Sequence, residues 1–174
     1  MKKFELTSET KINIFGKKLF RIKALISFAD VEAGETGGWV EKEGNVNQSG
    51  DAWVYGDAWV SGNAKVSGNA EVYGDAWVSD NAKVYGDAEV YGNAKVYGDA
   101  WVYGNADYTT IHGFGTQFRT TTFFRCKDKK VRVACGCFFG TIPEFREQVK
   151  NTRKGKIAEE YLMIADLMEK HFEK

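Results

Sequence analysis

The chain has 174 residues, of which 43% are hydrophobic and 28% are charged, and its formal net charge is zero. That length holds one large domain with a buried core, with or without small end modules. The sequence contains no run of roughly eighteen apolar residues and no apolar segment after Met1, so we expect a cytoplasmic protein that is neither exported nor inserted into a membrane.

The N-terminal segment alternates polar and apolar residues on both sides of Gly16-Lys17. This alternation predicts a hairpin with strands over residues 11–15 and 19–25. We expect residues 1–40 to form a β cap, because the open end of a stack of strands would expose unpaired backbone groups.

The middle of the chain repeats every six residues from Ala52 to Ala106. Each repeat has an alanine, a valine two places later and a glycine two places after that, and only Asp80 replaces a glycine. Alanine and valine at this spacing point to the same side of an extended segment. Glycine followed by Asp or Asn suits a corner. The pattern predicts short strands joined by corners over residues 41–110, and its regular inward residues argue against low-complexity disorder.

The recurring pairs Val54/Ala58, Val60/Ala64 and Val66/Ala70 resemble the left-handed β-helix of the hexapeptide-repeat superfamily. The resemblance implies three repeats per triangular coil, a left-handed winding, about four coils and assembly as a trimer. The expected fold is therefore mainly β, with a left-handed parallel β-helix between two end modules.

With three repeats per coil, the outward residues fall into columns along three faces. Aligned aromatic side chains on flat faces predict a homo-oligomer, and the superfamily suggests a trimer. An alternative is that the aromatic ladders only stabilise neighbouring coils. The expected interface residues are Trp53, Tyr55, Trp59, Tyr73, Trp77, Tyr91 and Trp101.

Residues 111–174 predict an α+β module made of a hairpin and two helices. The expected strands are 119–125 and 131–138, with Phe124 opposite Val133 and the thiols of Cys135 and Cys137 on one strand face. Thr141 and Glu144 form a capping-box pattern with Pro143 between them, which predicts a helix to about residue 153. A second helix is expected from Ile157.

A basic region surrounds the predicted hairpin, because residues 108–156 carry a net charge of +8 while residues 38–107 carry −7. Arginine forks, hydroxyl groups and aromatic rings together can bind phosphates and stack bases. For the lysines of the turn, Lys127 to Lys130, a solvated surface is the preferred interpretation. The candidate ligand-binding residues are His112, Arg119, Thr120, Thr121, Thr122, Phe123, Arg125, Arg132 and Phe138.

Acyl transfer is the enzymatic alternative, because many hexapeptide-repeat proteins are acyltransferases that use a histidine as general base. Only His112 lies near the repeats, and no loop interrupts them. Zinc-dependent members of the superfamily need three histidines, whereas the chain has two. We interpret the three cysteines as reduced thiols, and Cys135 and Cys137 as small buried residues rather than metal ligands. We therefore assign no catalytic residue, no metal and no cofactor, and favour a protein that is not an enzyme.

The whole chain resembles a group of small phage- and prophage-encoded proteins. The matching stretches are residues 37–43, 112–115, 120–125, 135–138 and 144–145. Because most members lack an assigned activity, the resemblance implies a phage setting more than a reaction.

The favoured hypothesis is a trimer in the host cytoplasm that sequesters a small anionic, nucleotide-like ligand, such as a host immune signal. One alternative is acetyl transfer from acetyl-CoA that depends on His112. Another is a scaffold that binds a host protein through its aromatic faces. Binding of a long nucleic acid is disfavoured, because the acidic repeats would repel it.

Overall fold

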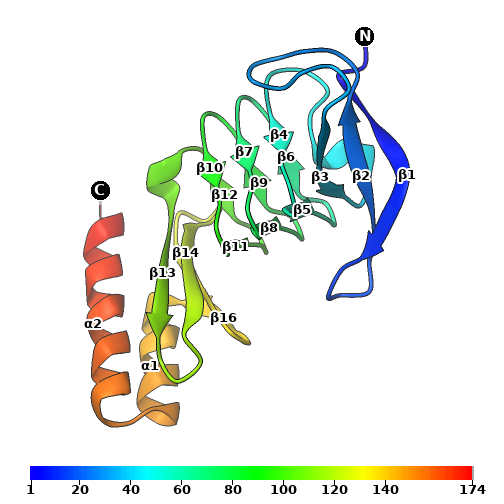
Figure 1. The fold of residues 1–174 in the computed structure, drawn as a ribbon. Coiled ribbons are helices and arrows are strands. Elements are labelled where there is room, and N and C mark those ends of the chain that lie inside the picture. The colour runs from blue at the N-terminus through cyan, green and yellow to red at the C-terminus, as the bar shows by residue number, and fades with distance from the viewer. Residues whose placement is uncertain (174) are drawn as a thin grey trace. The chain divides into compact units, whose positions relative to one another are not determined.

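The computed structural model describes residues 1–173. The chain divides into two compact units, Met1–Asn105 and the residues from Ala106 onwards. Figure 1 shows the first unit as a coiled stack of short strands with the N-terminal hairpin at one end, and the second as a sheet with two helices.

The N-terminal hairpin consists of β1 (Phe4–Ile12) and β2 (Lys18–Ala24), which pair in antiparallel fashion. Strand β3 (Thr36–Val40) pairs antiparallel with β2 and parallel with β5 (Trp59–Val60). The predicted N-terminal β element is therefore present, and it lengthens one face of the coiled stack into a continuous sheet of order β1-β2-β3-β5-β8-β11.

The repeats form a β-solenoid of parallel sheets in which each strand pairs with the strand eighteen residues further on, as Trp59 does with Trp77. This spacing corresponds to three repeats per coil and about four coils, and it supports the left-handed β-helix predicted from the sequence. One face contains β4 (Trp53–Val54), β7 (Glu71–Val72) and β10 (Glu89–Val90). The second contains β5, β8 (Trp77–Val78) and β11 (Lys95–Val96). The third contains β6 (Lys65–Val66), β9 (Lys83–Val84) and β12 (Trp101–Val102). The 3-10 turns η1 (Glu43–Asn45) and η2 (Asn105–Asp107) flank the coils.

The interior of the solenoid is filled by the recurring valine and alanine side chains. From Ala52 to Val102 these positions have no exposed surface. Burying one valine contributes about 1.5 kcal/mol, so the stacked columns supply most of the driving force for coiling. The corners need glycine where coils approach closely, since a Cβ at Gly68 would lie 2.9 Å from the Gly86 nitrogen. Asp80 is the exception at φ 60°, and its carboxylate accepts a hydrogen bond from the Gly98 N–H at 3.0 Å.

Side chains satisfy the backbone of the first coil where no earlier coil exists. Within the stack the Ala70 carbonyl accepts from the Trp53 N–H at 3.1 Å. The equivalent Ala52 carbonyl, one coil earlier, accepts instead from the Lys3 ammonium at 2.7 Å. On another face the side-chain amide of Asn45 donates to the carbonyls of Gly62 (3.2 Å) and Ala64 (2.9 Å). Lys3 and Asn45 therefore replace the missing backbone donors.

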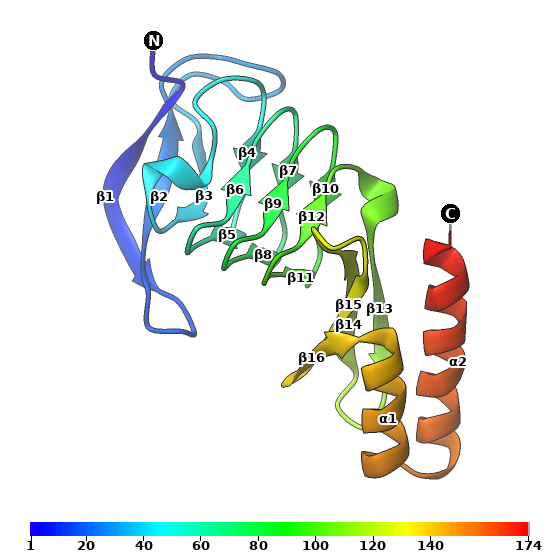
Figure 2. The same ribbon diagram turned by 180° about the vertical axis from the view of Figure 1, so that it is seen from behind.

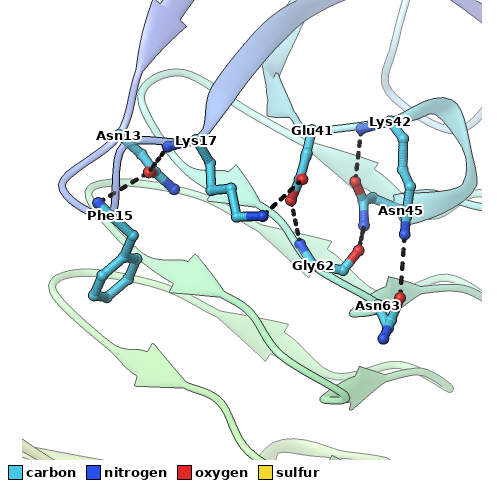
Figure 3. Close-up of polar contacts among 8 residues, drawn as sticks. All are labelled: Asn13, Phe15, Lys17, Glu41, Lys42, Asn45, Gly62 and Asn63. Atoms are coloured by element: carbon cyan, nitrogen blue, oxygen red, sulfur yellow. Dashed lines mark hydrogen bonds and ion pairs between the residues drawn. The ribbon is translucent and has the colours of Figure 1, made fainter.

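Figure 3 shows how the N-terminal hairpin and η1 are tied to the corner of the first coil. Asn45 also accepts from the Lys42 N–H at 2.9 Å, and the Lys42 ammonium reaches Asn63 at 3.2 Å. Glu41 accepts from the Gly62 N–H at 2.6 Å and pairs with Lys17 at 3.5 Å. The hairpin is thus bonded to a coil rather than only resting on it.

The second unit has an antiparallel sheet with the order β13-β14-β15-β16. Its strands are β13 (Tyr108–Phe114), β14 (Arg119–Arg125), β15 (Val131–Cys135) and β16 (Phe138–Thr141). Helices α1 (Ile142–Thr152) and α2 (Gly155–Phe172) follow, and Figure 2 shows them side by side. Phe123 and Val133 of the sheet pack with Phe145 of α1 and Ile164 of α2 in one core. Among the residues described, neither helix is long and apolar enough to cross a membrane.

The predicted capping box is confirmed, whereas the predicted strand register is wrong by one residue. Thr141 caps α1 and exchanges hydrogen bonds with Glu144. Phe123, not Phe124, lies opposite Val133. The reason is the turn, where Lys129 adopts φ 64° and the Cys126 N–H donates to the Lys130 carbonyl. A shift of one residue exchanges the two faces of the strand.

The expectation that Cys135 and Cys137 lie on one strand face is also wrong. Gly136 has φ 60°, and β15 ends at Cys135. Cys135 pairs with Phe138, so Gly136 and Cys137 form the turn that leads into β16. The segment predicted as one strand over residues 131–138 is therefore a strand, a tight turn and the first residue of the next strand.

Replacing Asn45 with alanine should lower the free energy of unfolding of the first unit by about 2 kcal/mol, because the Ala64 carbonyl in a buried hydrogen bond and the Gly62 carbonyl in a partly buried one lose their donor. Tryptophan fluorescence during urea denaturation measures this directly, since every tryptophan lies between residues 39 and 101. Asn63→Ala, which removes hydrogen bonds at an exposed corner, is the control and should change stability by about 0.5 kcal/mol or less. Equal losses in the two variants would contradict the capping role of Asn45.

Lys3 should make the first unit more stable as the pH rises above 8. Burial lowers the pKa of Lys3 to about 8 from its ordinary 10.5, and Asp51 opposes the shift. The unfolded chain therefore binds more protons than the folded chain between these two pH values, and the free energy of unfolding increases across that window. Urea denaturation at several pH values should show this increase in the wild type relative to Lys3→Met. Parallel curves for the two proteins would rule it out.

Candidate functional site

The predicted ligand-binding residues of β14 do not share one surface, because they alternate between the two faces of the strand. Phe123 is fully buried in the core beneath the helices, and the Thr121 hydroxyl donates to the Cys135 sulfur at 3.2 Å. Thr120 points to the other face, where its Oγ1 lies 2.9 Å from Nδ1 of His112. Thr122 is fully buried. The threonine run is therefore not a continuous row of hydroxyls open to a ligand.

Arg125 and Arg132, also predicted for the site, have their charges compensated within the second unit. The Arg125 guanidinium pairs with Asp107 at 3.2 Å and donates to the Phe172 carbonyl at 2.7 Å, at the end of α2. Arg132 pairs with Asp128 at 2.7 Å. In this structure both residues hold elements of the fold together.

Arg119 and Phe138 of the predicted set line a pocket of about 90 Å³ in the second unit. The loop between β13 and β14 forms one side, the turn between β15 and β16 another, and α1 with the following Arg153 and Tyr161 of α2 the rest. We call this the arginine pocket. The polar side chains that line it are Thr116, Gln117, Arg119, Cys135, Cys137, Gln148, Thr152, Arg153 and Tyr161.

The arginine pocket combines two guanidinium groups with a wall that has no carboxylate among the described residues. No described residue forms an ion pair with Arg119, and Arg153 donates one hydrogen bond, to the Thr152 carbonyl at 3.2 Å. Burial, followed by the neighbouring Cys135, raises the pKa of Tyr161, and the charges of Arg153 and Arg119 oppose this rise. Both positive charges therefore act at the tyrosine hydroxyl inside the pocket.

Aromatic rings pack against one another at the wall of the pocket. Phe145 contacts Phe138 at 5.5 Å and Tyr161 edge-to-face at 5.8 Å, measured between ring centroids. The Tyr161 hydroxyl donates to the Phe114 carbonyl at 3.2 Å. A Cβ at Gly136 would collide with the Arg119 guanidinium, so glycine at this turn leaves the arginine room to lie across it.

The size and charge of the arginine pocket suit a small oxyanion. Pockets that enclose a drug-sized ligand measure roughly 300–1,000 Å³, so about 90 Å³ holds one phosphate-sized group and not a whole nucleotide. Guanidinium groups recognise phosphate and carboxylate oxygens with paired, charge-assisted hydrogen bonds. The chemistry available here is therefore the binding of an anion.

Sequence reasoning missed the part of this site that lies in the helical segment. Arg153 and Gln148 are more than twenty residues downstream of Arg119, and Tyr161 lies within the helix expected from Ile157, with no other role predicted for it. The signal in the sequence that could have indicated this part of the site is a segment without acidic residues, from 148 to 158.

The aromatic residues predicted for an oligomer interface make contacts within the chain. Trp53 is completely buried between Phe4 and Phe28, whose rings meet it edge-on at 5.8 and 5.3 Å. Trp53 therefore offers no exposed surface to a partner chain. Its cover comes from Phe4 and Phe28 of the N-terminal segments, which lie outside the repeat, so the columns of outward residues do not reveal it.

The other predicted interface residues form ladders along the faces. Trp59 and Trp77 stack at 4.9 Å, and Phe15 at the tip of the hairpin packs edge-on against both. Tyr73 stacks on Tyr91 at 5.3 Å. The hydroxyls of Tyr55 and Tyr73 donate to Glu71 and Glu89, respectively, and Lys83 lies over the Trp101 ring at 5.1 Å. These contacts stabilise neighbouring coils, and oligomer formation stays a prediction.

Comparison with known protein families places a match in the solenoid. The family model described as the YdcK β-solenoid repeat matches residues 88–104, which make up the last coil of the solenoid. No curated protein matches the chain. The matched repeat and the stacked coils of the structure together show that the chain is a β-solenoid repeat protein.

Proposed function

We propose that the protein is a non-enzymatic binding protein whose arginine pocket takes the phosphate group of a small anionic ligand. The observation that carries this proposal is that Arg119 and Arg153 both line a pocket of about 90 Å³. The described residues of its wall include no carboxylate. A phosphate oxyanion would supply the negative charge that the pocket lacks, and each guanidinium can donate two parallel hydrogen bonds to it.

The wider proposal keeps the assembly and the setting inferred from the sequence. The protein would act as a homotrimer in the cytoplasm of a phage-infected host and would sequester a nucleotide-like immune signal. The resemblance of residues 37–43, 120–125 and 135–138 to phage-encoded proteins supports the setting. The partly exposed Tyr91 and Tyr103 of the solenoid faces support the assembly.

Binding fits the site better than the alternative of acetyl transfer. That reaction would need His112 as a general base within reach of the acceptor. His112 is exposed, shares a hydrogen bond with Thr120 and is not part of the wall of the arginine pocket. A scaffold that binds a host protein through the aromatic faces remains the other alternative.

Calorimetric titration with ribose 5-phosphate should detect binding that depends on both arginines. Arg119→Gln and Arg153→Gln should each weaken binding by about tenfold to a hundredfold, the range for loss of a charge-assisted hydrogen bond of about 1.5–3 kcal/mol. Lys150→Gln removes one positive charge from α1 outside the pocket and should change the affinity less than about twofold. If the wild type does not bind, or if all three variants weaken binding equally, the pocket is not a phosphate site.

The charge of the pocket should also be visible in the alkylation of Cys137, which is exposed and lines the pocket. The anionic reagent iodoacetate should react with Cys137 faster, relative to neutral iodoacetamide, in the wild type than in the variant with both Arg119→Gln and Arg153→Gln. Inorganic phosphate should reduce the wild-type ratio towards that of the variant. Peptide mass spectrometry measures both rates, and an unchanged ratio in the double variant would show that the arginines create no local positive field at the thiol.

A further inference from the structure

Phe118 occupies an unusual position at the edge of the arginine pocket. It lies in the loop between β13 and β14, and its two chain neighbours, Gln117 and Arg119, both line the pocket. Its side chain is 66% exposed, and its backbone has φ 48°, in the left-handed region. The loop is closed by the pairing of Phe114 with Arg119.

Two features of Phe118 are each unfavourable for the isolated protein. The left-handed conformation costs a residue with a bulky side chain roughly 1–2 kcal/mol, and glycine or asparagine would adopt it more easily. An aromatic ring exposed to water also contributes none of the hydrophobic stabilisation that its burial would add to the folded protein. Phe118 is not part of the hydrophobic core formed by the described residues of the second unit, so burial in that core does not offset these costs.

Comparison with the other exposed aromatic residues sets Phe118 apart. Phe15 packs against Trp59, Tyr91 against Tyr73, Tyr103 against Tyr85 and Phe139 against Phe124. Among residues 1–173, Phe118 is the exposed aromatic side chain with no ring contact. A strained residue beside a pocket is where a contact with a ligand is expected to provide the compensation.

We propose that Phe118 is a stacking platform for the base of a nucleotide whose phosphate is held by Arg119 and Arg153. This inference rests on the proposed function and names the ligand class of the same site. A pocket of about 90 Å³ has no room for a base, so the base must lie outside it, at the rim. Phe118 directly precedes Arg119, with Cα atoms about 3.8 Å apart, so the ring and one of the two guanidinium groups belong to neighbouring residues at the rim.

Stacking on an aromatic side chain contributes about 1–3 kcal/mol per base, and every base has a face that can stack. The site should therefore favour nucleotides over sugar phosphates without strong preference among bases. Phe118 would set this specificity, while the arginines would set affinity for the phosphate.

Calorimetric titration of the full chain with AMP, CMP, GMP and UMP, each compared with ribose 5-phosphate, tests the proposal. The nucleotides should bind about tenfold more tightly than ribose 5-phosphate, as one stacked base predicts. Phe118→Leu should remove this advantage and leave the affinity for ribose 5-phosphate unchanged. Phe118→Gly should do the same and, because it relieves the left-handed strain, should keep or raise the midpoint of thermal unfolding.

The outcomes separate this inference from the function on which it rests. If ribose 5-phosphate and the nucleotides bind equally, or if Phe118→Leu weakens both by the same factor, the stacking role is wrong while the phosphate pocket stands. If Phe118→Gly lowers the unfolding midpoint, Phe118 serves the fold and the stacking role is again wrong. If no phosphate compound binds, the proposed function and this inference fail together.

Discussion

The solenoid depends on backbone hydrogen bonds that run from each coil to the next. Rungs inside the stack, such as Trp59 N–H to the Ala76 carbonyl at 3.1 Å, join residues seventeen positions apart. The same arrangement leaves the first coil without donors for some of its carbonyls, and a buried carbonyl without a donor costs about 1–3 kcal/mol. Lys3 and Asn45 meet that requirement with side chains. The N-terminal segments are therefore a structural part of the repeat domain.

The hairpin of β1 and β2 has a second consequence for the aromatic faces. Columns of tryptophan on a monomer would be a large exposed apolar surface. Phe4 and Phe28 cover Trp53, and Phe15 reaches over Trp59 and Trp77. Much of the aromatic surface that the repeat generates is thus used within one chain. Any partner chain would meet the rest, which includes Tyr91 and Tyr103.

Some arginines of the second unit form ion pairs that hold the fold together, and others line the arginine pocket. Arg125 and Arg132 are paired with Asp107 and Asp128, whereas Arg119 has no acidic partner in the described structure. The net charge of this region therefore says little about binding until the partners are known. What distinguishes the arginine pocket is that two guanidinium groups face one small space lined by rings and thiols, where an anion would be partly shielded from water.

The sequence by itself determined the coil. A six-residue period places valine and alanine inside, and the positive φ of the corners selects glycine, with Asp80 as a tolerated exception. The cap of α1 was also local, because Thr141 and Glu144 are three residues apart. Each of these features depends on residues close together in the chain or on a regular repeat, so the sequence alone is enough to predict it.

Only the tertiary structure decided which surfaces stay exposed and which charges stay uncompensated. The cover over Trp53 comes from residues more than twenty positions away, and the arginine pocket joins Arg119 to Arg153 across two turns and a helix. The register of the β14–β15 hairpin depended on the left-handed backbone of Lys129. Lysine does not favour that conformation, so the sequence did not indicate it. Contacts between distant segments leave no period in the sequence, since they depend on how separate elements pack.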